Sequence, residues 1–143
     1  MAITHAPTHR HPSTWVDRRS LGAFLVLHGV AHFVGLSANI DLARDHRAAA
    51  LLGGVWHVNS RPALLALAIA WGVVGAAVIV TALLIDVGAR SSRRVMTVVA
   101  AVSLALSIVN LWAAVVGVVI NASLLAVGWI APQRLGLAAT SDA

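Results

Sequence analysis

Cysteine, lysine, glutamate and tyrosine are all absent from the 143-residue sequence. Without cysteine the chain can form no disulfide, no thiolate metal site and no cysteine nucleophile. Charged residues make up only 10% of the chain, against about 25% in an ordinary soluble domain. The glycines form no nucleotide-binding fingerprint, and neither the H-E-x-x-H zinc motif nor the G-x-S-x-G hydrolase motif occurs. These absences favour a membrane protein and reveal no known catalytic motif.

Most of the chain is apolar instead. Hydrophobic residues account for 59% of it, and the mean hydropathy is +0.88. A helix needs about 20 apolar residues to cross the roughly 30 Å hydrocarbon core of a bilayer. Four apolar runs predict membrane spans at about 20–40, 63–85, 95–109 and 114–131. We therefore expect an all-α fold, an integral membrane four-helix bundle.

The last two spans come from one uncharged stretch, 95–131. A single helix of that length would measure about 55 Å, which is too long for a bilayer. We divide the stretch into a hairpin of two helices that turns near residues 110–113. One tilted span followed by a re-entrant segment is the alternative.

Three segments lie outside the predicted spans. Residues 1–19 and 132–143 are polar tails, and 41–62 is the longest loop. Within that loop, the stretch from Asp41 to Leu52 predicts a short amphipathic helix at the membrane surface, ended by two glycines.

Arginine predicts the orientation of the bundle. Seven of the ten arginines lie in the two tails and the 86–94 loop, and three lie in the 41–62 loop. Cytoplasmic segments of membrane proteins carry the excess of positive charge. We therefore expect both termini in the cytoplasm. The basic clusters are too short to indicate nucleic-acid binding.

Small residues predict where the helices approach each other closely. The first span has glycines at 22, 29 and 35. In the second span a small residue recurs at every fourth position, at Ala68, Gly72 and Ala76. Trp71 lies near the middle of that span, although tryptophan is usually found at the membrane surface.

The most informative residues are His28 and His32, in the middle of the first span. Residues four apart share one helix face, about 6 Å from each other. Ionisable side chains are costly inside a membrane and need partners. Ser103 and Ser107 in the third span and Asn121 in the fourth fall at a similar depth. We expect these side chains to form one polar layer near the midplane, because water cannot satisfy them there.

Four interpretations of the pair remain open. In the first, neutral imidazoles hydrogen-bond to Asn121 or Ser103 and hold the helices together. In the second, the pair binds a metal or haem, with His57 the one plausible extra ligand, because the spans supply no other at that depth. In the third, the pair takes part in proton or quinone chemistry, with Asn121 and Ser103 also touching the cofactor. In the fourth, it contacts another subunit.

A family resemblance rests on Leu27-His28-Gly29-Val30-Ala31-His32-Phe33-Val34-Gly35, followed by a Trp-His loop and a last span with asparagine. The chain resembles small bacterial four-span proteins of unassigned function that carry L-H-G-x-x-H-x-x-G in their first helix. More loosely, it is similar to the DoxX-like four-helix membrane proteins, some of which associate with quinone-linked oxidoreductases. The resemblance covers roughly 18–131. It implies a four-helix bundle in the inner membrane of a bacterium and assigns no catalytic residue.

Together these patterns favour a small non-catalytic membrane subunit or accessory protein without a cofactor. Its expected partners are the lipid bilayer and either copies of itself or a larger membrane-protein complex. The alternative is a redox-linked membrane protein that binds a metal, haem or quinone through His28 and His32.

Overall fold

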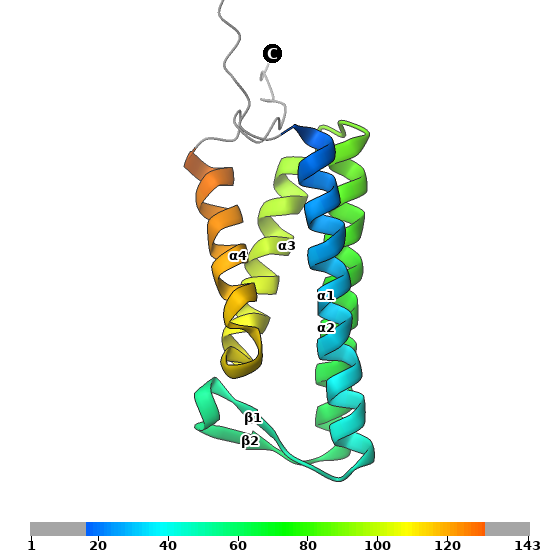
Figure 1. Ribbon diagram of the computed structural model, residues 1–143, viewed down its shortest axis with the longest axis vertical. Helices are drawn as coiled ribbons and strands as arrows, with labels where there is room; N and C mark the ends of the chain where they lie inside the picture. Colours follow the sequence, from blue (N-terminus) through cyan, green and yellow to red (C-terminus); the bar gives the residue numbers. More distant parts are fainter. Residues whose placement is uncertain (1–16, 131–143) are drawn as a thin grey trace, which may run out of the picture.

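The computed structural model describes residues 17–130, which form four helices and one short hairpin (Figure 1). The helices are α1 (Arg18–Arg44), α2 (Arg61–Asp86), α3 (Ser92–Val109) and α4 (Leu111–Ile130). All four are long and apolar enough to cross a membrane. The expected all-α membrane bundle is therefore confirmed. The tails predicted at 1–19 and 132–143 lie almost wholly outside the described residues.

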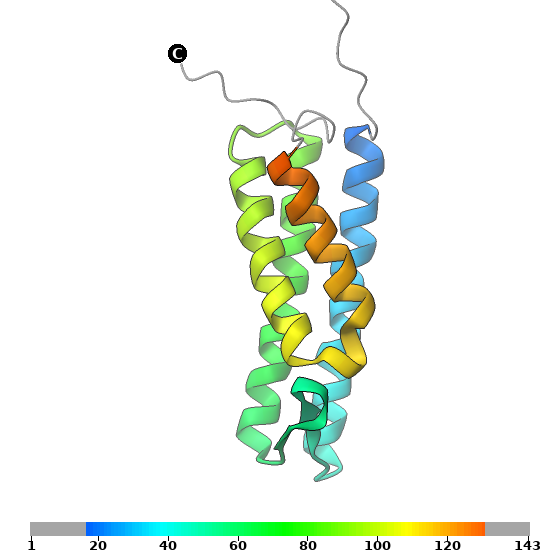
Figure 2. The same ribbon diagram turned by 90° about the vertical axis from the view of Figure 1, so that its left-hand side faces the viewer.

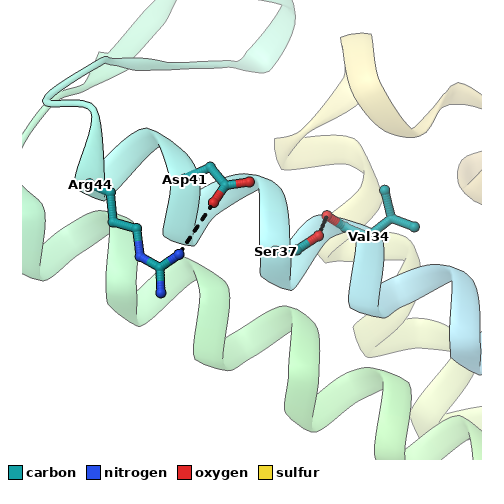
Figure 3. A network of polar contacts seen from close by, with 4 residues as sticks. All are labelled: Val34, Ser37, Asp41 and Arg44. Carbon is teal, nitrogen blue, oxygen red and sulfur yellow. Dashed lines mark hydrogen bonds and ion pairs between the residues drawn. The ribbon is translucent and has the colours of Figure 1, made fainter.

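Helix α1 begins and ends with polar side chains that extend it beyond its apolar run. Asp17 caps its first turn by accepting hydrogen bonds from the Ser20 amide (2.8 Å) and the Ser20 hydroxyl (2.9 Å). At the other end, the Arg44 guanidinium forms an ion pair with the Asp41 carboxylate one turn back, with 3.8 Å between Nη1 and Oδ1 (Figure 3). The helix thus continues through residues 41–44, which were predicted to belong to the loop.

The amphipathic helix predicted from Asp41 to Leu52 is wrong. After α1 the chain forms strands β1 (Ala49–Leu51) and β2 (Trp56–Val58), joined by the short 3₁₀ turn η1 (Leu52–Gly54). The strands pair antiparallel, with Ala50 opposite His57. Gly53 and Gly54 both have positive φ, which lets the chain reverse here at little steric cost. The short apolar runs on either side of the glycines are the signature of a hairpin.

Helices α1 and α2 form the main antiparallel pair and touch at two glycines. A Cβ on Gly29 would lie 2.8 Å from the Gly75 carbonyl oxygen, and one on Gly75 would lie 2.8 Å from that of Gly29. The predicted packing face of α2 is therefore partly wrong, because Ala76 is exposed while Gly75 is buried. A strict four-residue step drifts around a helix of 3.6 residues per turn. The buried stripe instead runs through Ala68, Trp71 and Gly75.

The stretch after residue 94 forms the two helices α3 and α4, with the turn at Asn110. The amides of Ala113 and Ala114 donate to the Asn110 carbonyl at 2.9 and 3.1 Å. These helices have 18 and 20 residues, against 27 and 26 in α1 and α2. The β1–β2 hairpin fills the space below their turn (Figure 1).

The helices form two pairs, α1 with α2 and α3 with α4, and α2 packs against α3. Helix α4 crosses the bundle at a slant and stands apart from α1 (Figures 1 and 2). The main core fills the end of the bundle away from the hairpin. Its buried members are Leu21, Leu25, Val74, Val78, Ala82, Ile85, Met96, Ala100 and Leu124.

Candidate functional site

The two histidines, Ser103 and Asn121 meet inside the bundle, and we call these four residues the polar layer. All four side chains are buried. His32 Nε2 lies 2.7 Å from Ser103 Oγ on α3, and His28 Nε2 lies 3.3 Å from Asn121 Oδ1 on α4. The layer therefore ties α1 to both helices of the other pair. Similar depth along the apolar runs was the signal that predicted this meeting.

The hydrogen bonds of His32 assign its tautomer. Its Nδ1 lies 2.9 Å from the His28 carbonyl oxygen, which can only accept, so Nδ1 carries the proton and donates. In the neutral ring Nε2 is then an acceptor, and the Ser103 hydroxyl donates to it. Both ring nitrogens of His32 are thus occupied by groups of the protein itself.

His28 uses only one of its ring nitrogens in this network. Asn121 Nδ2 donates to the Gly117 carbonyl at 2.8 Å, which directs Oδ1 towards His28. His28 Nε2 must therefore be the donor, and the neutral ring has an acceptor at Nδ1. Among the described residues Nδ1 has no hydrogen-bond partner. The His28 and His32 rings meet edge to face, with their centroids 4.8 Å apart.

Trp71 of α2 packs against this layer at a place where α1 has a glycine. The Trp71 ring centroid lies 5.3 Å from that of His32. A Cβ on Gly35 would come within 2.5 Å of the indole ring. Gly35 thus makes room for a tryptophan in mid-membrane. The sequence showed the unusual position of Trp71 but did not link it to the histidines.

A pocket of about 260 Å³ adjoins the layer between α1 and α4. His28, His32, Trp71 and Ser107 line it together with apolar and small residues. Trp71 Nε1 and Ser107 Oγ are buried and have no hydrogen-bond partner among the described residues. Ser107 was expected in the polar layer, one turn from Ser103, but it lies at this pocket instead. We call this space the α1–α4 pocket.

The residues around the pair do not fit a metal centre. His57 lies exposed on β2, and the structure does not bring it to His28 and His32. Residues 17–130 contain no group of three or more histidine, cysteine or acidic side chains that could hold a metal ion. A metal bound by both histidines would also have to break a hydrogen bond of His32. The same applies to haem ligation by the pair.

Comparison with known proteins does not assign the chain to a family. No protein-family model, curated protein or solved structure matches this chain. The resemblance carried by the histidine motif stays a prediction, and the site has to be interpreted from its own geometry.

Proposed function

We propose that this protein is a small non-catalytic subunit or accessory protein of a larger membrane assembly. The observation that carries the proposal is the use of the histidine pair. Both ring nitrogens of His32 form hydrogen bonds within the bundle, and His28 bonds to α4. Polar groups that link helices in this way stabilise a membrane protein. The pair therefore has a structural role that needs no reaction.

The outer surface supports the assembly role. Large apolar side chains on all four helices are exposed, among them Leu27, Val73, Val102 and Val116. Between the described spans the chain has only a short hairpin and two tight turns. Such a protein meets mainly lipid and other membrane helices. We propose that it associates with copies of itself or with a larger membrane protein.

The proposed location is the inner membrane of a bacterium, with both termini in the cytoplasm. The N-terminal end of α1 and the C-terminal end of α4 lie at the same end of the bundle (Figure 1). Arg18, Arg19, Arg90, Arg93 and Arg94 belong to that end, and Arg44, Arg47 and Arg61 belong to the hairpin end. The excess of arginine favours the first end as the cytoplasmic one.

The test is the mass of the protein after gentle extraction from its native membrane. We expect a particle larger than the 14.8 kDa chain, measured by native mass spectrometry, either as a multiple of this chain or with a second polypeptide. A single chain that is alone in the membrane, as judged also by cross-linking before extraction, would contradict the assembly role.

The redox-linked alternative has a separate test. Absorption spectra and elemental analysis of the same preparation are compared with those of a His28→Ala/His32→Ala double variant. We expect no haem band and no stoichiometric metal in either sample, because the His32 nitrogens are already engaged. A cofactor present in the native protein and lost in the variant would replace the accessory role with cofactor binding.

A further inference from the structure

Trp71 and Ser107 line the α1–α4 pocket, and each carries a buried hydrogen-bond donor that the described part of the chain does not satisfy. Trp71 is 7% exposed and Ser107 is 0% exposed, and neither Trp71 Nε1 nor Ser107 Oγ has a partner there. Buried polar groups are almost always paired in folded proteins, and each exception needs an explanation. In a membrane the need is greater because hydrocarbon offers no acceptor.

The chemistry of these two groups specifies what is missing. An indole N–H can only donate, and a serine hydroxyl without another partner donates readily. Both therefore call for an acceptor such as a carbonyl oxygen. His28 also lines the pocket, and its neutral ring has an acceptor at Nδ1 that forms no hydrogen bond among the described residues.

The size and walls of the pocket specify the rest of the ligand. Small residues of α1 and α4 leave the space open, namely Ala31, Gly35, Ala38, Ala113, Ala114 and Gly117. Its volume of about 260 Å³ exceeds the roughly 150 Å³ cavity that holds a benzene ring. It is also many times the roughly 30 Å³ that one water molecule takes up. An apolar body of about two fused rings fits this space better than water does.

The position of the pocket indicates where the ligand comes from. Val34 of α1 and Val116 of α4 line it and are themselves 68% and 71% exposed. These side chains stand on the two helices that are set apart in Figure 1. The pocket thus adjoins the lateral surface of the bundle, which faces lipid in a membrane protein.

We propose that the α1–α4 pocket binds a small lipid-soluble molecule with a carbonyl oxygen, held by Trp71 Nε1–H and Ser107 Oγ–H. This binding site goes beyond the assembly role and does not depend on it. A chain that binds such a molecule while standing alone would disprove only the assembly role.

The probe is acetylnaphthalene with a ¹³C-labelled carbonyl, added to the full-length protein in lipid nanodiscs. Ethylnaphthalene has the same ring system without the acceptor and is the matched ligand control. Infrared difference spectra against empty nanodiscs report the bound carbonyl, and titration gives the dissociation constant. We expect a carbonyl band at lower frequency than in lipid, and ethylnaphthalene binding at least about five-fold weaker.

Two substitutions connect the signal to the donors. Ser107→Ala and Trp71→Phe should each weaken acetylnaphthalene binding about five-fold and raise the frequency of its carbonyl band. Ser123→Ala and Trp56→Phe are the matched controls, because Ser123 bonds to the Val119 carbonyl and Trp56 lies on the exposed hairpin. They should change neither. Thermal melting identifies any variant that has lost its fold, and Ser107→Ala, the smaller change, then decides.

Three results would overturn the proposal. The two naphthalenes could bind equally, the Ser107→Ala variant could leave the carbonyl band in place, or the folded protein could bind no probe at all. In the last case, a change of oligomeric mass in Ser107→Ala would assign the pocket to a partner chain. An unchanged mass would mean that water occupies the pocket.

Discussion

At the residue scale, Ser103 and Ser107 show what spacing along the chain can and cannot predict. The two serines share one face of α3 and are buried alike. Their depth predicted that they would meet the histidines. Ser103 donates to His32, whereas Ser107 lies at the α1–α4 pocket without a hydrogen-bond partner in residues 17–130. A single turn of helix separates the two outcomes, and that difference depends on how α4 crosses the bundle.

The His32–Ser103 bond can be measured with a double-mutant cycle. His32→Leu removes a ring that bonds to its own helix backbone and to α3, so we expect it to lower the free energy of unfolding by about 2–4 kcal/mol. Ser103→Ala should cost about 1 kcal/mol. The coupling between them should be about 0.6 kcal/mol and at most about 1.7 kcal/mol, the average and the maximum found for hydrogen bonds between membrane helices.

Unfolding in mixed micelles by increasing detergent denaturant gives all four stabilities of this cycle. His57→Leu is the control for replacing a histidine, because His57 lies exposed on β2. It should have little effect. Additive losses from His32→Leu and Ser103→Ala would mean that the bond does not stabilise the bundle.

The N-terminal cap of α1 has a pH dependence of known sign. Hydrogen bonds from the Ser20 amide and hydroxyl lower the pKa of Asp17 below its ordinary value of 3.8. A carboxyl group whose pKa falls on folding stabilises the folded form above the unfolded pKa. That stabilisation is lost as the pH falls through the lower, folded value. We therefore expect the first turn of α1 to fray in acid.

Hydrogen exchange of the Ser20 amide, followed from neutral pH to below 3.8, measures this fraying after correction for the intrinsic exchange rate. Asp17→Asn keeps a side-chain oxygen that can cap the helix but cannot titrate. Its protection should be independent of pH over the same range. Equal pH dependence in both proteins would show that Asp17 is not the group responsible.

At the element scale, helices were predictable and their ends were not. Apolar runs of about the right length predicted four helices, since a helix satisfies the backbone hydrogen bonds of an apolar segment within that segment. Asp41 and Arg44 continue α1 beyond its apolar run, because polar residues form helix as readily outside the membrane. The hairpin was missed because the 41–52 stretch also matches an amphipathic helix. Two adjacent glycines with positive φ allow the tight turn that the structure has instead.

The contact between α1 and α2 gives the sharpest test at this scale. A methyl group on Gly75 would meet the Gly29 carbonyl oxygen at 2.8 Å, and two helix backbones would have to separate. We expect Gly75→Ala to destabilise the protein by about 1–3 kcal/mol. At Gly72 the same methyl group would meet only Leu36, at 3.5 Å. Gly72→Ala should therefore be neutral or stabilise the protein by up to about 1 kcal/mol.

Both alanine variants gain the same helix propensity, so the difference between their stabilities isolates the backbone contact. Detergent-induced unfolding of the two proteins, measured side by side, provides it. Similar stabilities would mean that α1 and α2 do not approach as closely at Gly29 and Gly75 as the structure places them.

At the scale of the whole molecule, the helices leave one side less closed than the others. The α1–α2 pair and the α3–α4 pair join through α2 and α3, while the pocket lies between α1 and α4. The number of spans and their polar faces followed from the sequence. The relative placement of the two pairs did not, because a bundle of four similar apolar helices can close in several ways. The pocket, and with it the role of Trp71, depends on that placement.

Introduced cysteines can test the orientation of this bundle in the membrane. The chain has no cysteine of its own, so a thiol reagent reacts only with the introduced residue. Ser91 is exposed in the α2–α3 turn, at the arginine-rich end, and Val55 is 85% exposed in the hairpin. We expect a membrane-impermeant maleimide added to intact cells to label Val55→Cys and to spare Ser91→Cys. After the cells are opened, both variants should be labelled. The reverse pattern would place the termini outside. It would mean that the excess of arginine at this end does not mark the cytoplasmic side of this protein.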